Sequence, residues 1–125
     1  MELTEKERLM LVQKKEEILK LTKEILDIMK DPEQALEVKK KMTSILSLIS
    51  TVGSYAKSKY DTRNLWTGTN MVFAQMNVLG DQWTAMSPFI EVFCNTVNLI
   101  KFDFTKRDIK IKIPKIDFSI FRSLK

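Results

Sequence analysis

The apolar residues between positions 72 and 100 recur in alternating steps of four and three. This row, called here the apolar seam, consists of Val72, Met76, Leu79, Trp83, Met86, Ile90, Phe93, Val97 and Ile100. Steps of four and three place side chains along one side of a helix, as in a coiled coil. The pattern predicts a long third helix over about residues 70–101. We expect a kink near Ser87-Pro88, or two collinear helices that meet there, because proline interrupts the helical hydrogen bonds.

Two earlier segments show the same kind of helical pattern. The first predicts a helix over about residues 4–30, with Thr4 as its N-cap. Asp31-Pro32-Glu33 marks a boundary, since proline is tolerated at the first position of a helix. A second helix is predicted over about residues 32–58. Residues 58–69 are expected to form the loop that leads to the third helix.

After Lys101 the pattern changes from helical to alternating. Isoleucines and lysines alternate over 109–113, and the alternation resumes at Ile116, which indicates extended β structure. No turn residues separate the two pieces, and no other strand is evident in the chain to pair with them. Residues 103–125 are therefore predicted to form an extended arm that lies along the bundle or pairs with another molecule. The arm residues expected to bind a partner are Ile109, Ile111, Ile113, Ile116, Phe118, Ile120 and Phe121.

These patterns together predict a mainly α protein. The expected architecture is an elongated antiparallel three-helix bundle over residues 1–102, followed by the arm over 103–125. The composition agrees, because 44% hydrophobic and 30% charged residues are typical of a folded chain. Three glycines and three prolines in 125 residues also argue against a turn-rich β fold.

The stretch that carries the apolar seam is also poor in charge. Asp81 and Glu91 are the only charged residues between Arg63 and Lys101, and a second apolar row runs beside the seam. A helix that is apolar on more than one side must be covered on more than one side. Either this helix packs centrally between the first two, or the seam is an interface between copies of the chain. We favour the oligomer interface, because two outer helices leave part of such a long helix uncovered.

The net charge of +5 at pH 7 is concentrated at the C-terminus, since residues 101–125 hold eight basic and three acidic residues. The lysines of an alternating strand can prevent edge aggregation, or can accompany a strand that pairs with a partner. They can also contact the phosphates of a nucleic acid or of anionic lipids. We favour a protein partner, because a simple phosphate-binding arm has no use for isoleucines. The candidate phosphate contacts are Lys106, Arg107, Lys110, Lys112 and Lys115.

Candidate chemistry is scarce. The chain has no histidine and a single cysteine, Cys94, so it lacks the usual general base and a cysteine-type zinc site. No phosphate-binding glycine motif occurs. We expect no catalytic, cofactor-binding or metal-binding residues and no small-molecule substrate. We therefore expect that the protein is not an enzyme. The charged start of the chain shows no signal peptide, so we expect a cytoplasmic protein, or one inside a virion assembled in the cytoplasm.

Trp66-Thr67-Gly68 lies between two predicted helices, and Phe104 precedes Asp108 by four positions. The first motif resembles the Trp-x-Gly turn of small helical-hairpin proteins exported by Gram-positive specialised secretion. The second stands at the spacing of the aromatic-x-x-x-acid signal that follows the second helix in that family. The resemblance covers at most residues 32–108, and the first helix and the β-patterned tail depart from it. We therefore interpret Trp66 as packed at a helix–helix turn, with Gly68 allowing the bend.

The sequence favours a non-enzymatic structural or assembly subunit. It would pack through the apolar seam and hold a neighbouring subunit with the arm, as a phage or virion component by analogy. One alternative is a small regulator or inhibitor that binds a host protein or nucleic acid through the basic arm. A second alternative is a membrane-active protein that inserts its charge-poor helix.

Overall fold

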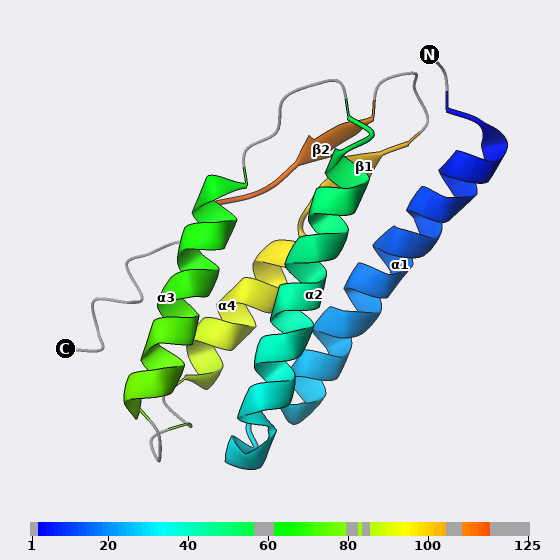
Figure 1. Cartoon of the computed structure of the whole chain (residues 1–125). Coiled ribbons are helices and arrows are strands. Elements are labelled where there is room, and N and C mark those ends of the chain that lie inside the picture. The colour runs from blue at the N-terminus through cyan, green and yellow to red at the C-terminus, as the bar shows by residue number, and fades with distance from the viewer. Residues whose placement is uncertain (1–2, 57–61, 80–82, 84–85, 105–108, 116–125) are drawn as a thin grey trace.

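The computed structural model describes residues 3–56, 62–79, 83, 86–104 and 109–115. Within this part of the chain the elements are α1 (Glu5–Ile28), the 3-10 turn η1 (Pro32–Gln34), α2 (Ala35–Gly53), α3 (Arg63–Leu79), α4 (Ser87–Asn98), β1 (Lys101–Asp103) and β2 (Lys110–Lys112). The four α-helices alternate in direction, and the two strands cross one end of the bundle (Figure 1). The prediction of a mainly α bundle with a β-patterned C-terminal segment is confirmed.

The N-terminal cap of α1 forms as its sequence predicts. The Thr4 hydroxyl accepts a hydrogen bond from the Glu7 backbone N–H at 3.1 Å, and the Glu7 carboxylate accepts one from the Thr4 N–H at 3.0 Å. This reciprocal arrangement is a capping box, which satisfies backbone donors that a helix start leaves open. The boundary at residues 31–34 also forms, with Asp31 capping η1, and α2 begins at Ala35.

The prediction of one kinked helix over residues 70–101 is wrong. The segment forms two helices, α3 and α4, and the chain reverses direction between them (Figure 1). Pro88 stands at the start of α4, where its missing N–H costs no helical hydrogen bond. The seam continues across the connection because Trp83 and Met86 are buried there, and the Trp83 indole N–H donates to the Met29 carbonyl oxygen. The regular spacing therefore reflects burial rather than one continuous helix.

The predicted loop over residues 58–69 is also shorter than expected, because α3 begins at Arg63. Trp66-Thr67-Gly68 lies within the first turns of this helix, so it forms neither a Trp-x-Gly turn nor a bend with a packed tryptophan. Trp66 is 40% exposed, whereas Leu65 and Thr69 are fully buried. The helical spacing of the buried residues begins before Gly68 and runs through it.

The C-terminal segment finds a strand partner within the chain, so the prediction that it has none is wrong. β1 and β2 pair antiparallel, with Lys101 opposite Lys112, Phe102 opposite Ile111 and Asp103 opposite Lys110. The sequence pattern predicts residues 101–103 as the end of the third helix and the start of the arm. Their polar–apolar–polar sequence, Lys101-Phe102-Asp103, is too short to distinguish a strand from a helix end by pattern alone.

The hairpin closes the core at the end of the bundle where α1 begins (Figure 1). Phe104, Ile109 and Ile111 belong to the same buried cluster as the helices, with Ile109 fully buried. The Arg8 guanidinium of α1 donates a hydrogen bond to the Phe104 carbonyl oxygen. The inner side of the hairpin is thus fixed in the core, and its outer side faces away from the bundle.

Candidate functional site

The apolar seam, predicted to be an oligomer interface, is buried within the chain's own core wherever its side chains are described. Met76 and Leu79 lie in α3, but their side chains fall outside the described part. The remaining seam residues are at most 7% exposed: Val72, Trp83, Met86, Ile90, Phe93, Val97 and Ile100. This corresponds to the other interpretation, in which the charge-poor segment packs centrally. In this conformation these seven side chains offer no surface to a second copy.

The arm residues predicted to bind a partner divide into two groups. Ile109 and Ile111 are buried in the core, and Ile113 is half-buried and packs against it. Ile109 and Ile111 are therefore covered by the chain itself, and Ile113 is covered in part. The others lie outside the described residues: Ile116, Phe118, Ile120 and Phe121.

Unlike the arm isoleucines, the candidate phosphate contacts that the structure describes are exposed to solvent. Lys110, Lys112 and Lys115 are exposed, whereas Lys106 and Arg107 lie outside the described residues. The pairing of β1 with β2 adds Lys101, which is exposed and directly opposite Lys112. Reasoning from the sequence missed Lys101, since its position on the outer side of the hairpin depends on recognising β1 as a strand.

The two opposed lysines share a shallow surface depression with two apolar residues. Leu99, Lys101, Lys112 and Pro114 line it, and we call these four residues the hairpin patch. Leu99 ends the last turn of α4 and remains 65% exposed. The patch therefore combines two cations and an exposed aliphatic side chain on a rigid support.

The electrostatics of the hairpin patch are unfavourable for the isolated chain. Like charges directly opposite each other on paired strands destabilise the pairing by a few tenths of a kcal/mol up to about 1 kcal/mol. Neither ammonium group forms an ion pair with a carboxylate in the described part of the chain. Asp103 is the acidic residue of the two strands, and it stands opposite Lys110 at the other end of the pairing. The carbonyl end of α4 offsets part of the repulsion.

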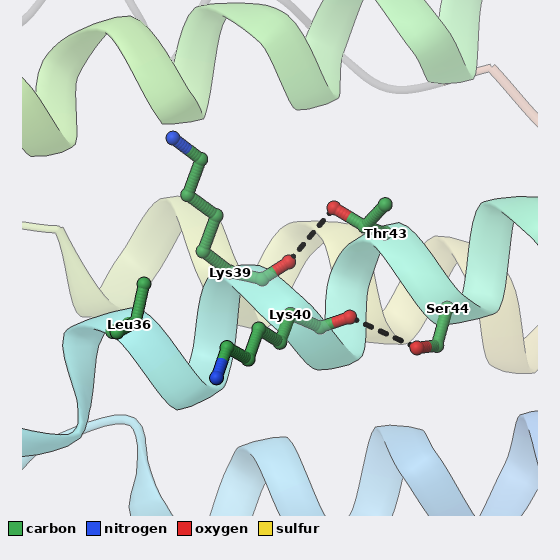
Figure 2. A pocket seen from close by; sticks show the side chains of 5 residues that line it. All are labelled: Leu36, Lys39, Lys40, Thr43 and Ser44. Atoms are coloured by element: carbon green, nitrogen blue, oxygen red, sulfur yellow. Dashed lines mark hydrogen bonds between the residues drawn. The ribbon is translucent and has the colours of Figure 1, made fainter.

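A second basic surface lies on α2, at the opposite end of the bundle. Leu36, Lys39, Lys40, Thr43 and Ser44 line a groove there, which we call the α2 patch (Figure 2). Leu36 is 65% exposed, the same fraction as Leu99. Lys39 reaches toward α3 and places its ammonium group 5.2 Å from the centre of the Phe73 ring. The Thr43 and Ser44 hydroxyls donate to the carbonyl oxygens of Lys39 and Lys40, both at 3.0 Å.

Of the two lysines of the α2 patch, Lys39 has a partner in the fold, whereas Lys40 forms no ion pair with a described residue. The Lys39 ammonium is attracted by the electron-rich face of Phe73. Glu37 precedes Lys40 by three positions and Lys41 by four on the same helix. Lys41 also forms an ion pair with Glu24 of α1, at 2.9 Å. Among its described neighbours the hairpin patch has neither an acidic nor an aromatic partner for its two directly opposed lysines, and it is therefore the better candidate site.

The single thiol offers no reactive group. Cys94 is fully buried in α4, and burial, with a smaller contribution from the charge of Glu91, raises its pKa to about 12. A protonated, buried thiol is a poor nucleophile. Among the described residues no cluster of three or more histidine, cysteine, aspartate or glutamate residues is arranged to hold a metal ion. No helix in this part of the chain is long and apolar enough to span a bilayer.

Comparison with known proteins found no family model, no curated protein and no solved structure that matches this chain.

Proposed function

We propose that this protein is a non-enzymatic binding subunit that attaches to an anionic macromolecular surface through the hairpin patch. The observation that carries the proposal is the direct opposition of Lys101 and Lys112 on the outer side of a hairpin whose inner side is buried. The fold gains nothing from placing two cations opposite each other. An anionic partner that contacts both ammonium groups removes their repulsion and gains two charge-assisted contacts.

The support beneath the patch favours binding. The hairpin is held by the buried Ile109 and by the hydrogen bond from Arg8 to Phe104. The backbone of both lysines is therefore ordered before a partner arrives, which lowers the entropic cost of association. Lys110 and Lys115 are also exposed nearby along the chain and extend the basic character of this end.

Immobilised heparin, a generic polyanion, provides the first test. The double variant Lys101→Gln/Lys112→Gln is compared with Lys39→Gln/Lys40→Gln, which removes the same charge from the α2 patch. We expect the hairpin variant to elute at clearly lower salt than wild type, because both contacts are lost. The α2 variant should elute close to wild type. Equal shifts for the two variants would mean that net charge alone governs retention, and the proposal would fail.

A second candidate function is assembly with further copies or other subunits, as expected for a structural protein. The observation that favours it is a set of exposed apolar side chains on α1. Leu9 is 57%, Val12 37% and Leu19 40% exposed, and they lie on the outer part of a long helix. This surface replaces the apolar seam as the candidate for contacts between subunits.

Light scattering on a sizing column tests this second candidate. A defined oligomer that dissociates on Leu19→Lys, but not on Leu36→Lys, would support assembly through α1. A monomer of 14.6 kDa at all concentrations would count against self-assembly and leave attachment through the hairpin patch as the function.

A further inference from the structure

We infer that the surface bound by the hairpin patch is an anionic lipid bilayer. This inference rests on the proposed function and names the partner for the same four residues. Here the protein lies on the surface of the bilayer. This differs from the membrane-active alternative, in which the charge-poor helix is inserted into the bilayer.

Leu99 stands among the lysines of the patch rather than away from them. It lines the same depression as Lys101 and Lys112, and 65% of its surface is exposed. The phosphate backbone of a nucleic acid offers no apolar region in which such a side chain is buried. The interface of a bilayer does, because acyl chains begin directly beneath the phosphates. A leucine that enters this layer loses contact with water and gains a corresponding share of the hydrophobic free energy.

The lysines suit the same partner. A lysine side chain can lay its aliphatic stem on an apolar surface while its ammonium group remains among the headgroups. Lys101 and Lys112 line the same depression as Leu99, so their ammonium groups can contact headgroup phosphates while the leucine is inserted. With Lys110 and Lys115, four exposed lysines occupy this end of the molecule. Clusters of about four to eight basic residues beside an apolar anchor are typical of recognition of anionic lipids.

Co-sedimentation with lipid vesicles tests the leucine and the lysines separately. The vesicles consist of phosphatidylcholine with or without phosphatidylserine, and the full-length chain is used. Wild type is expected to bind only when phosphatidylserine is present, and less strongly at higher salt, because the attraction is screened. Lys101→Gln/Lys112→Gln should weaken binding by about 30-fold, from about fivefold per lysine near an anionic surface.

The leucines provide the matched pair that distinguishes a bilayer from other polyanions. Leu99→Ser should weaken vesicle binding by about tenfold, as expected for a leucine that is buried on binding. Leu36→Ser removes an equally exposed leucine from the α2 patch and should leave binding unchanged. Neither variant should alter elution from heparin, which has no apolar layer. Circular dichroism and urea unfolding establish that all variants are folded.

The outcomes separate this inference from the proposed function. If Leu99→Ser binds vesicles as wild type does, the leucine does not enter the bilayer and the inference is overturned. It is also overturned if a DNA duplex is bound through Lys101 and Lys112 while the anionic vesicles are not, although attachment to a polyanion would then stand. If neither heparin nor vesicles distinguish the hairpin lysines from those of the α2 patch, the proposed function itself fails.

Discussion

The two ends of the bundle present patches of similar composition in different settings. Each patch combines a leucine that is 65% exposed with two lysines. On α2, Lys39 lies over the Phe73 ring, and Glu37 precedes Lys40 by three positions on the same helix. On the hairpin, Lys101 and Lys112 face each other without a described counter-ion. Composition alone therefore does not identify a binding surface. The hairpin patch differs because its two lysines oppose each other and neither has a partner among the described residues.

The largest expected effect comes from loosening the support of the hairpin patch. Ile109 is fully buried beneath the strands, so Ile109→Ala removes packing contacts and leaves a cavity. We expect a loss of about 2–5 kcal/mol in the free energy of unfolding, as for other buried isoleucines. Urea denaturation followed by circular dichroism measures this loss. Heparin elution should move to lower salt, because the two lysines are no longer held together.

The matched control is Val38→Ala, which shortens a buried side chain of α2. It should also lower stability but leave heparin elution nearly unchanged at temperatures where the variant is folded. If both variants alter elution equally, the binding surface does not depend on the hairpin.

A smaller effect is expected from releasing the hairpin from α1. Arg8→Met removes the hydrogen bond from the guanidinium to the Phe104 carbonyl oxygen while keeping most of the aliphatic stem. Hydrogen bonds to charged groups contribute about 1.5–3 kcal/mol, so the free energy of unfolding should fall by an amount in this range. Lys6→Met on the exposed side of α1 removes the same charge and serves as the control. An unchanged urea midpoint for Arg8→Met would show that this contact does not hold the hairpin.

The two patches should respond to charge substitution with opposite signs. Lys39→Gln removes the cation from the Phe73 ring and should lower the free energy of unfolding by about 0.5–1 kcal/mol. Lys112→Glu replaces a like-charge pair by an opposite-charge pair across the strands, and should raise it by about 0.2–1 kcal/mol. Thermal unfolding at low salt compares the two variants. A loss of stability in Lys112→Glu would contradict the claim that the fold opposes this lysine pair.

The smallest effect concerns pH at the hairpin end of α1. The pKa of Glu7 lies below its usual value of 4.5, because its carboxylate accepts a hydrogen bond from the Thr4 backbone and caps the helix. A lowered pKa in the folded state stabilises the fold above pH 4.5, and this contribution is lost as pH falls through the folded pKa. Glu7→Gln should therefore flatten the acid limb of stability against pH. Glu24→Gln should flatten the same limb through a different contact, because the hydrogen bond from Lys41 lowers the pKa of that carboxyl in the folded state. An acid limb that Glu7→Gln leaves unchanged would contradict the prediction.

Much of the helical architecture follows from local patterns. Thr4 is followed three residues later by Glu7, and this spacing specifies the capping box that begins α1. Asp31-Pro32 marks the boundary before α2 for an equally local reason. The seam residues were correctly recognised as requiring cover. Which part of the molecule covers them depends on contacts between α1, α2 and α4, and periodicity carries no information about those contacts.

The errors arose where a local signal had two structural meanings. Gly68 was interpreted as a turn residue, yet it is buried inside α3, where the neighbouring Leu65 and Thr69 set the helical phase. Pro88 was interpreted as a kink, although proline at the start of a helix is equally compatible with a reversal of the chain. The candidate site was found only in part. The alternating pattern predicts that Lys112 is exposed. Its position opposite Lys101 depends on the pairing of β1 with β2, and strands of three residues are too short for the sequence to predict that pairing.

The central claim is that the hairpin binds while the apolar seam remains inside the molecule. Hydrogen–deuterium exchange of the full chain with and without heparin tests both halves of this claim in one measurement. The account predicts slower exchange over residues 99–104 and 109–115 on binding, with unchanged exchange in α3 and in the first turns of α4. Altered exchange along α3 and α4, with an unaffected hairpin, would show that the seam opens to meet the partner and would contradict the account.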